Sequence, residues 1–323
     1  MAEATYRTDG DTLDLTAAAA YTAGQVIQLA SGLAAVPAND IASGDLGGFQ
    51  TCGTHRVAKT ASVVIVDGQP VYWDHSANTA TYAPASDRDF FIGCAADDAA
   101  SAATTVDVLL NVKPTYKIEL GRFGIEHEFL TVVVKTVVGS ITVEVPSLTM
   151  QGGAAKMIFG ATAEAQKVDL LSQQGFAVGS NWIVEGGFNL IDDGDATAID
   201  FSIGVASGTH ATDADAIAES VFLHTDGNTV DIFSESDDGT TEVAAEDTTV
   251  NYALGTPVHF VIDGRSPAGV LIYINGVARG TGPYVLSAAT GPLKLLAHLE
   301  KTSDDTTADY RINYLRVRTM EQD

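Results

Sequence analysis

The feature that most constrains the fold is a two-residue alternation of apolar and polar side chains in the C-terminal part of the chain. Residues 182–190, 198–205 and 258–263 carry it. In the first segment, for example, Trp182 falls on one face and Glu185 on the other. Because successive side chains of a β-strand point to opposite faces, we predict antiparallel strands with one core face and one solvated face.

Turn signals separate these segments at short intervals. An Asn275-Gly276 pair lies between strand-like flanks, which is the strongest short-range signal for a β-hairpin. Further strands are expected over 291–300 and 309–319, and helical turns only over 161–171 and 213–220. With at least seven short strands and no long helical period, residues 151–323 are predicted to form an antiparallel β-sandwich or jelly roll.

The N-terminal part, residues 1–113, is predicted to be a separate small β-rich domain. Strands are expected over 60–68, 71–74 and 105–112, between segments rich in Gly, Asp and Pro. Residues 114–150 are interpreted as a connecting β-rich segment. The predicted fold class is therefore mostly β, with a small β-rich domain followed by a sandwich.

Composition narrows the range of partners. The net charge of −25 makes nucleic acid a poor partner, because binding it requires Lys and Arg to neutralise phosphates. No apolar stretch approaches the ~20 residues that span a bilayer, and no secretory signal is visible at the N-terminus. Cys52 and Cys94 lack the spacing of a zinc site, so we expect two buried thiols. We therefore expect no nucleic-acid partner, no membrane partner and synthesis in the cytoplasm.

An ordered set of short segments runs along residues 1–113. It comprises "AGQVIQL", "DIASGDLG", "GTHRVAKT", "DGQPVYWDHSANTATY", "IGCAADDAA" and "VDVLLN". In this order they resemble the capsid cement, or head decoration, proteins of tailed phages. The resemblance implies a structural virion protein that binds major capsid protein on the outer surface of an expanded head, often as a homotrimer at threefold positions. Tyr72 and Trp73 are then a strand and a core aromatic that follow a turn, rather than a ligand platform.

The C-terminal part resembles concanavalin-like or laminin-G-like jelly rolls. The segments "GTPVHFVIDGRSPAGVLIYINGVARG" and "DYRINYLRVRT" carry this resemblance. Such folds host lectins, adhesins, hydrolases and spacers, so an activity has to be argued from a site. The alternative function is therefore a carbohydrate-binding adhesin, with glycans as its partner.

An enzyme is not expected. Glycosidases need a pair of carboxylates across the scissile bond, and Glu185 is the lone acid on its strand, where we expect it to face solvent. No serine lies in a G-x-S-x-G turn. We therefore predict no catalytic residue and no cofactor.

Calcium is the alternative for the acidic loops. Asp192, Asp193 and Asp195 form one cluster with Asp200 nearby, and a second lies over 237–242. Clustered carboxylates suit a hard cation, but Asp and Gly are also ordinary turn residues, and neither segment fits an EF-hand loop. We interpret both clusters as turns and keep Asp192, Asp193 and Asp195 as the calcium candidates.

A sugar site needs an exposed aromatic side chain beside polar groups. Tyr252, Tyr273 and Tyr284 are the candidates for this role, whereas the alternation around Trp182 places that side chain in the core.

Overall fold

The computed structural model describes residues 11–116, 118–120, 133–144, 155–195, 198–211 and 213–319. The chain divides into two compact units, Met1–Thr115 and Tyr116–Asp323. Every regular element of the described residues is a β-strand, so the predicted mostly β fold class is confirmed. Within these residues no helix is long and apolar enough to cross a membrane.

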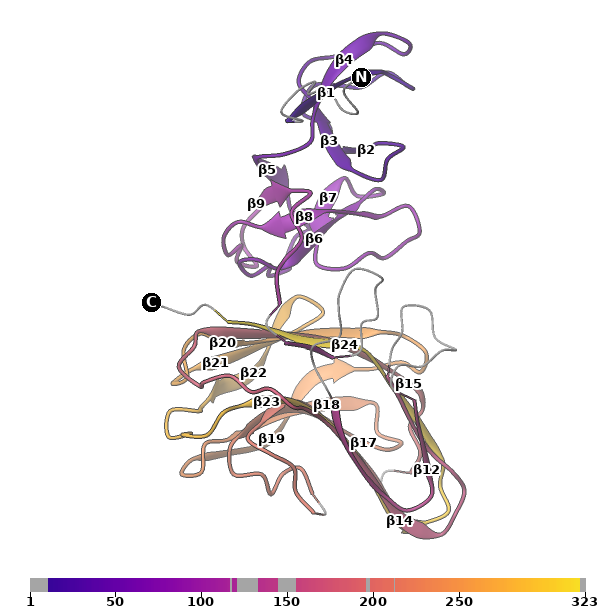
Figure 1. Ribbon diagram of the computed structural model, residues 1–323, viewed down its shortest axis with the longest axis vertical. Helices are drawn as coiled ribbons and strands as arrows, with labels where there is room; N and C mark the ends of the chain where they lie inside the picture. Colours follow the sequence, from indigo (N-terminus) through magenta and orange to yellow (C-terminus); the bar gives the residue numbers. More distant parts are fainter. Residues whose placement is uncertain are drawn as a thin grey trace, which may run out of the picture. The chain divides into compact units, whose positions relative to one another are not determined.

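The first unit contains two antiparallel sheets (Figure 1). The four-stranded sheet has the order β1-β4-β3-β2 and the five-stranded sheet the order β5-β9-β8-β6-β7. The strands are β1 (Thr12–Thr16), β2 (Ile27–Gln28), β3 (Ala34–Pro37), β4 (Leu46–Gln50), β5 (Thr54–Ala58), β6 (Pro70–Asp74), β7 (Thr79–Thr81), β8 (Phe90–Ala95) and β9 (Thr105–Leu110).

The first unit has two apolar cores, and the one against the five-stranded sheet also includes Ala34 and Val36 of β3. Phe49 belongs to the core of the four-stranded sheet, and Val71 and Trp73 belong to the core of the five-stranded sheet. The predicted strand at "VYWD" is confirmed as β6, with Tyr72 on the opposite face against Phe91. Trp73 is therefore a core side chain, as the sequence indicates.

Two expectations for the first unit are wrong. Residues 61–68 form turns with a single bridge from Ile65 to Ala99 instead of a strand, although Ile65 still reaches the core. Cys94 is buried as expected, but Cys52 is exposed and donates a hydrogen bond to Asp11 at 2.9 Å. Cys52 lies in the short turn between β4 and β5, where no sheet covers it.

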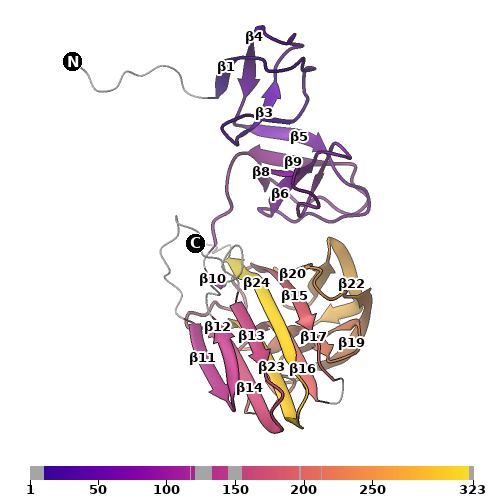
Figure 2. The same cartoon turned by 90° about the vertical axis from the view of Figure 1, so that its right-hand side faces the viewer.

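The second unit is a sandwich of two antiparallel sheets of eight and seven strands (Figure 2). The eight-stranded sheet has the order β12-β13-β24-β15-β20-β21-β22, with β10 also paired to β24, and the seven-stranded sheet has the order β11-β14-β23-β16-β17-β18-β19. The first eight strands are β10 (Ile118–Leu120), β11 (Val133–Val138), β12 (Ile141–Glu144), β13 (Ala155–Phe159), β14 (Glu164–Ser172), β15 (Trp182–Asp192), β16 (Ile199–Ala206) and β17 (Ser220–Asp226). The others are β18 (Asp231–Asp237), β19 (Glu242–Asn251), β20 (Val258–Gly264), β21 (Val270–Ile274), β22 (Val277–Tyr284), β23 (Lys294–Asp304) and β24 (Ala308–Thr319).

The core of the sandwich follows the alternation in the sequence. Trp182, Phe188, Phe201 and Tyr310 are among its large side chains, and all four are nearly or fully buried. Apolar burial of this kind stabilises by roughly 25 cal/mol per Å² of surface removed from water. The face predictions for residues 182–190 and 198–205 are therefore right on the core side.

The solvated side of these strands is not as expected. Glu185 and Ser202, on the faces directed away from the core, are 2% and 0% exposed. Ser202 is buried because a segment between β16 and β17 covers the seven-stranded sheet, and Glu185 because arginine and tyrosine side chains cover it. The expectation of wet outer faces is therefore wrong at these positions.

The two predicted helical turns are absent. Residues 164–172 form strand β14, which is paired on both sides, with β11 and β23. Residues 213–219 form turns and bends that end at β17. Between two partner strands, extended backbone satisfies the backbone hydrogen bonds of residues 164–172, and this overrides their local helix propensity.

The second unit begins and ends at adjacent strands. Ile118 lies opposite Val317 and Leu120 opposite Leu315, so β10 pairs antiparallel with β24. The described strands between 114 and 150 also pair inside this unit, β11 with β14 and β12 with β13.

Candidate functional site

A row of polar side chains crosses the outer face of the seven-stranded sheet. Asp169 lies opposite His298, His298 opposite Ser202, and Ser202 opposite His224 in successive strands. Directly opposed residues have Cβ atoms about 5 Å apart, so the row is continuous over β14, β23, β16 and β17. Their sequence neighbours, such as Val168 and Leu223, point into the sandwich core, which fixes the row on the other face.

The covering segment, residues 207–211 and 213–219, buries this row. Its Ala214 and Ile217 form a small apolar cluster with Leu171, Phe222 and Leu296 of the sheet. The carboxylate of Glu219 accepts hydrogen bonds from the backbone of residues 290 and 291, which ties down the end of the segment. Polar groups on this face are thereby removed from water.

His298 occupies the most buried part of the row. Burial disfavours its charged form, but Asp169 Oδ1 at 2.7 Å and Glu300 Oε2 at 3.2 Å outweigh that effect and raise the pKa of His298 to about 9. The ring is therefore protonated at neutral pH and donates from both nitrogens. Lys167 Nζ lies 3.0 Å from the second oxygen of Asp169. This part of the row is a closed ion-pair network.

His224 lies among four carboxylates. Its Nε2 is 2.6 Å from Asp226 Oδ1 and 3.5 Å from Asp200 Oδ1. Its Nδ1 is 3.6 Å from Glu235 Oε1 and 3.7 Å from Asp215 Oδ1. Three adjacent strands and the covering segment supply these groups, so one imidazole stands at the centre of a strongly acidic cluster.

Burial controls the electrostatics of the cluster. It raises the pKa of Asp200 to about 6 and that of Glu235 to about 7. Burial alone would lower the pKa of His224, but the nearby carboxylates of Asp215, Asp226 and Glu235 hold it well above its ordinary value. Four carboxyl groups thus surround one imidazole, so one positive charge stands against several negative ones.

Two sets of three side chains have ligand atoms close enough together for one metal ion. They are Asp200, His224 and Asp226, and Asp215, His224 and Glu235. Of these residues, the sequence analysis had singled out only Asp200. The available signal was the pair of alternating polar segments "HTD" at 224–226 and "SESD" at 234–237, on strands that a short turn makes neighbours.

The calcium candidates lie elsewhere, at the last residue of β15 and just after it. The carboxylate of Asp192 accepts a hydrogen bond from the Thr307 hydroxyl, and that of Asp193 accepts one from Tyr252 at 2.9 Å. The backbone carbonyl of Asp195 accepts the N–H of Ile199 at 2.9 Å. Within the described chain, the three residues join no group of three potential metal ligands, and calcium binding by them stays a prediction.

The second acidic cluster holds turns together. The Asp238 carboxylate accepts backbone hydrogen bonds from Thr240, Thr241 and Ala288 at 3.0, 2.7 and 3.0 Å. These bonds hold the pKa of Asp238 below its ordinary value.

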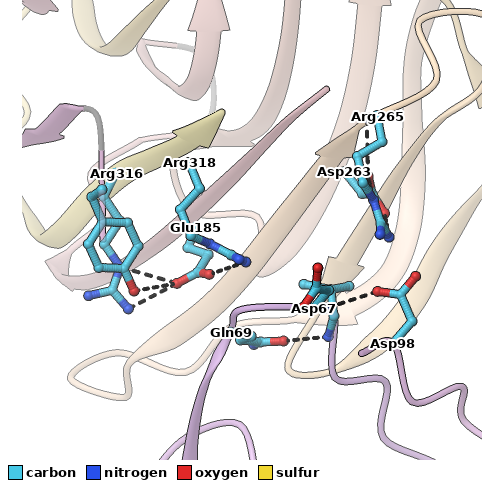
Figure 3. A network of polar contacts seen from close by, with 10 residues as sticks. Asp67, Gln69, Asp98, Glu185, Asp263, Arg265, Arg316 and Arg318 are labelled. Carbon is cyan, nitrogen blue, oxygen red and sulfur yellow. Dashed lines mark hydrogen bonds and ion pairs between the residues drawn. The ribbon is translucent and has the colours of Figure 1, made fainter. Parts of the chain in front are cut away.

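Glu185 is not a solvent-facing acid, and its expected position is corrected. Figure 3 shows its carboxylate between Arg316 and Arg318, at 2.9 Å and 2.8 Å from their terminal nitrogens. The Tyr116 hydroxyl donates to it at 3.2 Å, and the Arg316 guanidinium stacks between the rings of Tyr116 and Tyr314. Glu185 therefore fastens the first residue of the second unit to β24.

The tyrosines proposed for sugar stacking are mostly enclosed. Tyr252 is 5% and Tyr284 1% exposed, and the Tyr284 hydroxyl is hydrogen-bonded to Ser234. Tyr273 is half-buried, and Trp182 is fully buried as predicted. Two of the three candidates therefore have no free ring face for a glycan.

The first unit offers a sheet edge and a small apolar surface. Strand β1 pairs with β4 and lies at one end of the four-stranded order. Leu46, at the start of β4, is 72% exposed. Before β6, Asp98 accepts the Asp67 N–H at 2.8 Å, and this contact and Gln69 fix the turn (Figure 3).

Comparison with known proteins identifies the first unit more closely than the second. Residues 7–110 match the family described as phage cement protein. No curated protein sequence matches the chain. The segment that carries the sequence resemblance is thus the one that the family matches.

Solved structures with low identity resemble the chain. The carbohydrate recognition domain of Emp47p is 10% identical with a TM-score of 0.45, covering 62% of this chain and 94% of that one. A structure reported for endo-acting O-glycanases of the human gut microbiota is 11% identical with a TM-score of 0.44, covering 64% and 99%. The family 7 alginate lyase A1-II′ is 12% identical with a TM-score of 0.39, covering 53% and 82%. Similarities of this size assign no activity to this chain.

Proposed function

We propose that this chain is a structural virion protein that binds the outer surface of an expanded phage head. Residues 1–113 act as the cement domain and residues 151–323 as a jelly roll displayed outward. The connecting segment, residues 114–150, contributes its described strands to the sheets of the jelly roll. The observation that carries the proposal is the match of residues 7–110 to the phage cement family. The role is binding rather than catalysis.

The mechanism is multivalent attachment. Each copy contacts neighbouring major capsid subunits, with three copies grouped as a homotrimer at a threefold position. Contacts that must break together raise the resistance of the shell far above that of a single contact. The net charge of −25 makes displayed copies repel one another, which keeps a crowded surface hydrated.

A strand-addition contact fits the edge position of β1. An edge strand has unpaired backbone N–H and C=O groups that can pair with a neighbouring chain. In the sequence, residues 2–10 precede this strand. We expect deletion of residues 2–10 to weaken head binding, because this N-terminal stretch is the candidate arm that adds a strand to a neighbour. Unchanged binding would remove it from the mechanism.

The decisive experiment is co-sedimentation with mature heads that lack this protein. The full chain and residues 1–115 are compared, because the first unit has its own cores. Saturable binding of both, with added density at threefold positions in images of the particles, is the expected result. If neither binds, or only the full chain does, the cement assignment fails.

A carbohydrate-binding adhesin is the second candidate, favoured by an open cavity of about 430 Å³ in the second unit. Residues 175–179 and 289–292 line it, and its volume lies in the range of small-ligand sites. A glycan array probed with the full chain tests it. Binding that is lost in Gly179→Arg would support this function, since an added Cβ at Gly179 meets no atom within 4 Å.

A further inference from the structure

The contacts of His224 divide into two kinds. The Nε2 distance of 2.6 Å to Asp226 is that of a charge-assisted hydrogen bond. The Nδ1 distances of 3.6 Å to Glu235 and 3.7 Å to Asp215 are too long for one, and Nδ1 has no hydrogen-bond partner. Nε2 is therefore held by a hydrogen bond, whereas Nδ1 points toward two carboxylates without bonding to either.

The longer distances fit ligands of a shared ion. Ligand atoms at ~2.1 Å from a tetrahedral metal ion are separated from one another by about 3.4 Å. The Nδ1, Glu235 Oε1 and Asp215 Oδ1 atoms all lie within 4.8 Å of one another. Small side-chain movements would bring all three onto one ion.

We propose that Asp215, His224 and Glu235 bind a divalent transition-metal ion of the zinc class. Asp226 would orient the imidazole by accepting a hydrogen bond from its Nε2. Metal-bound histidines usually donate their other N–H to a carboxylate, which fixes the tautomer that leaves a lone pair for the metal. Asp226 is placed for this role at Nε2. The proposal is independent of capsid binding.

Burial supports a built site rather than a surface patch. His224 and Glu235 are each 6% exposed, and Glu235 Oε1 has no hydrogen-bond partner either. Asp215, on the covering segment, is an exposed residue and leaves a path from solvent. Buried acceptor atoms without partners cost free energy, which a bound cation would recover.

The excess of negative charge around His224 also favours a bound cation. Asp200, Asp215, Asp226 and Glu235 surround a single imidazole, and the sequence contains no Lys or Arg between Lys167 and Arg265. Without metal, a proton on Nδ1 is the positive charge inside the cluster, and the protonated His298 also acts on Asp200 and Asp215 from the same row. A divalent ion would replace that proton and add a further charge, so binding should release protons.

The donor set selects the class of metal. An imidazole with two carboxylates suits zinc and its neighbours, whereas calcium prefers oxygen ligands alone. The other set, Asp200, His224 and Asp226, is less suitable because its ring nitrogen is already committed to Asp226.

Zinc titration of the chelator-treated full chain by calorimetry tests the proposal. We expect one zinc ion per chain, with a binding enthalpy that varies with the ionisation enthalpy of the buffer because protons are released. Asp215→Asn should abolish this site without unfolding the protein, since the side chain is 46% exposed. Asp226→Asn should weaken binding about 10- to 100-fold, as expected for a carboxylate that orients a ligand.

Asp237→Asn is the matched control, because it removes one negative charge from the same strand as Glu235 without removing a ligand. It should bind zinc like the natural chain. Cobalt in place of zinc should give the intense visible absorption of a tetrahedral site, lost in Asp215→Asn. The proposal is overturned if the natural chain binds no stoichiometric zinc, or if Asp215→Asn and Asp237→Asn bind zinc equally.

Discussion

At the scale of single residues, the Gly186-Gly187 pair shows how closely both faces of β15 are packed. A Cβ atom on Gly186 would lie 2.1 Å from the Phe260 ring, and one on Gly187 would lie 2.8 Å from the Tyr314 ring. Two aromatic rings, one on each face of the sheet, therefore require a strand without side chains at this point.

We expect Gly186→Ala to lower the free energy of unfolding by roughly 1–3 kcal/mol, because the Phe260 ring must leave its position in a close-packed core. Chemical denaturation followed by fluorescence measures the change. Gly160→Ala is the control, since an added Cβ there meets nothing within 4 Å. Equal stability of the two variants would contradict the packing argument.

His298 gives a pH-dependent contribution to stability. Its pKa is raised from 6.5 to about 9, because Asp169 and Glu300 outweigh the effect of burial. A raised pKa stabilises the folded state below pH 6.5, and this contribution is lost as the pH rises through 9. A shift of this size corresponds to roughly 3 kcal/mol.

His298→Gln should therefore be less stable than the natural chain by about that amount at pH 6, and the difference should shrink between pH 6.5 and 9. Urea denaturation at a series of pH values measures it. A stability difference that does not change with pH would show that the loss comes from packing alone.

At the scale of strands and segments, the sequence predicts a strand best where one face of the strand is apolar and the other polar. The core faces of β15 and β16 follow directly from alternation. A helical turn was expected over residues 161–171. Residues 166–172 of β14 are instead buried on both faces of the sheet, which leaves no apolar–polar alternation in their sequence. Alternation fails wherever a second layer covers the outer face.

The acidic cluster at His224 was not predictable in the same way. Its members come from β16, β17, β18 and the covering segment, and cross-strand register together with the path of the covering segment brings them together. The nearest signal, polar residues alternating in two adjacent strands, also fits an ordinary solvated face. The calcium candidates, by contrast, are close in sequence and were easy to find. The side chains of Asp192 and Asp193 make loop contacts, and calcium binding stays a prediction.

The covering segment should be held largely by its apolar contacts. Ile217 is 6% exposed and packs in the cluster with Phe222 and Leu296. We expect Ile217→Ala to cost about 2–4 kcal/mol and to speed hydrogen exchange of residues 207–219 more than that of the sandwich core. Val230→Ala, at a position 47% exposed, is the control. Uniform exchange rates across the unit would argue against a separately held segment.

At the scale of the whole molecule, each unit has its own apolar core. We therefore expect two thermal unfolding transitions in calorimetry, since separate cores lose cooperativity with each other. Residues 1–115 alone should reproduce one of them. A single transition for the full chain, absent from the fragment, would show that neither unit folds independently.

The pairing of β10 with β24 has a practical consequence. The strand that starts the second unit and the strand that completes it are hydrogen-bonded neighbours, with Tyr116 clamped beside them by Glu185 and Arg316. A unit whose first and last strands are neighbours can be exchanged as a whole, because both of its chain ends lie at one place. Under the proposed function, exchange of this unit for another protein with adjacent termini would turn the decorated head into a display scaffold and leave the proposed head-binding residues, 1–113, unchanged.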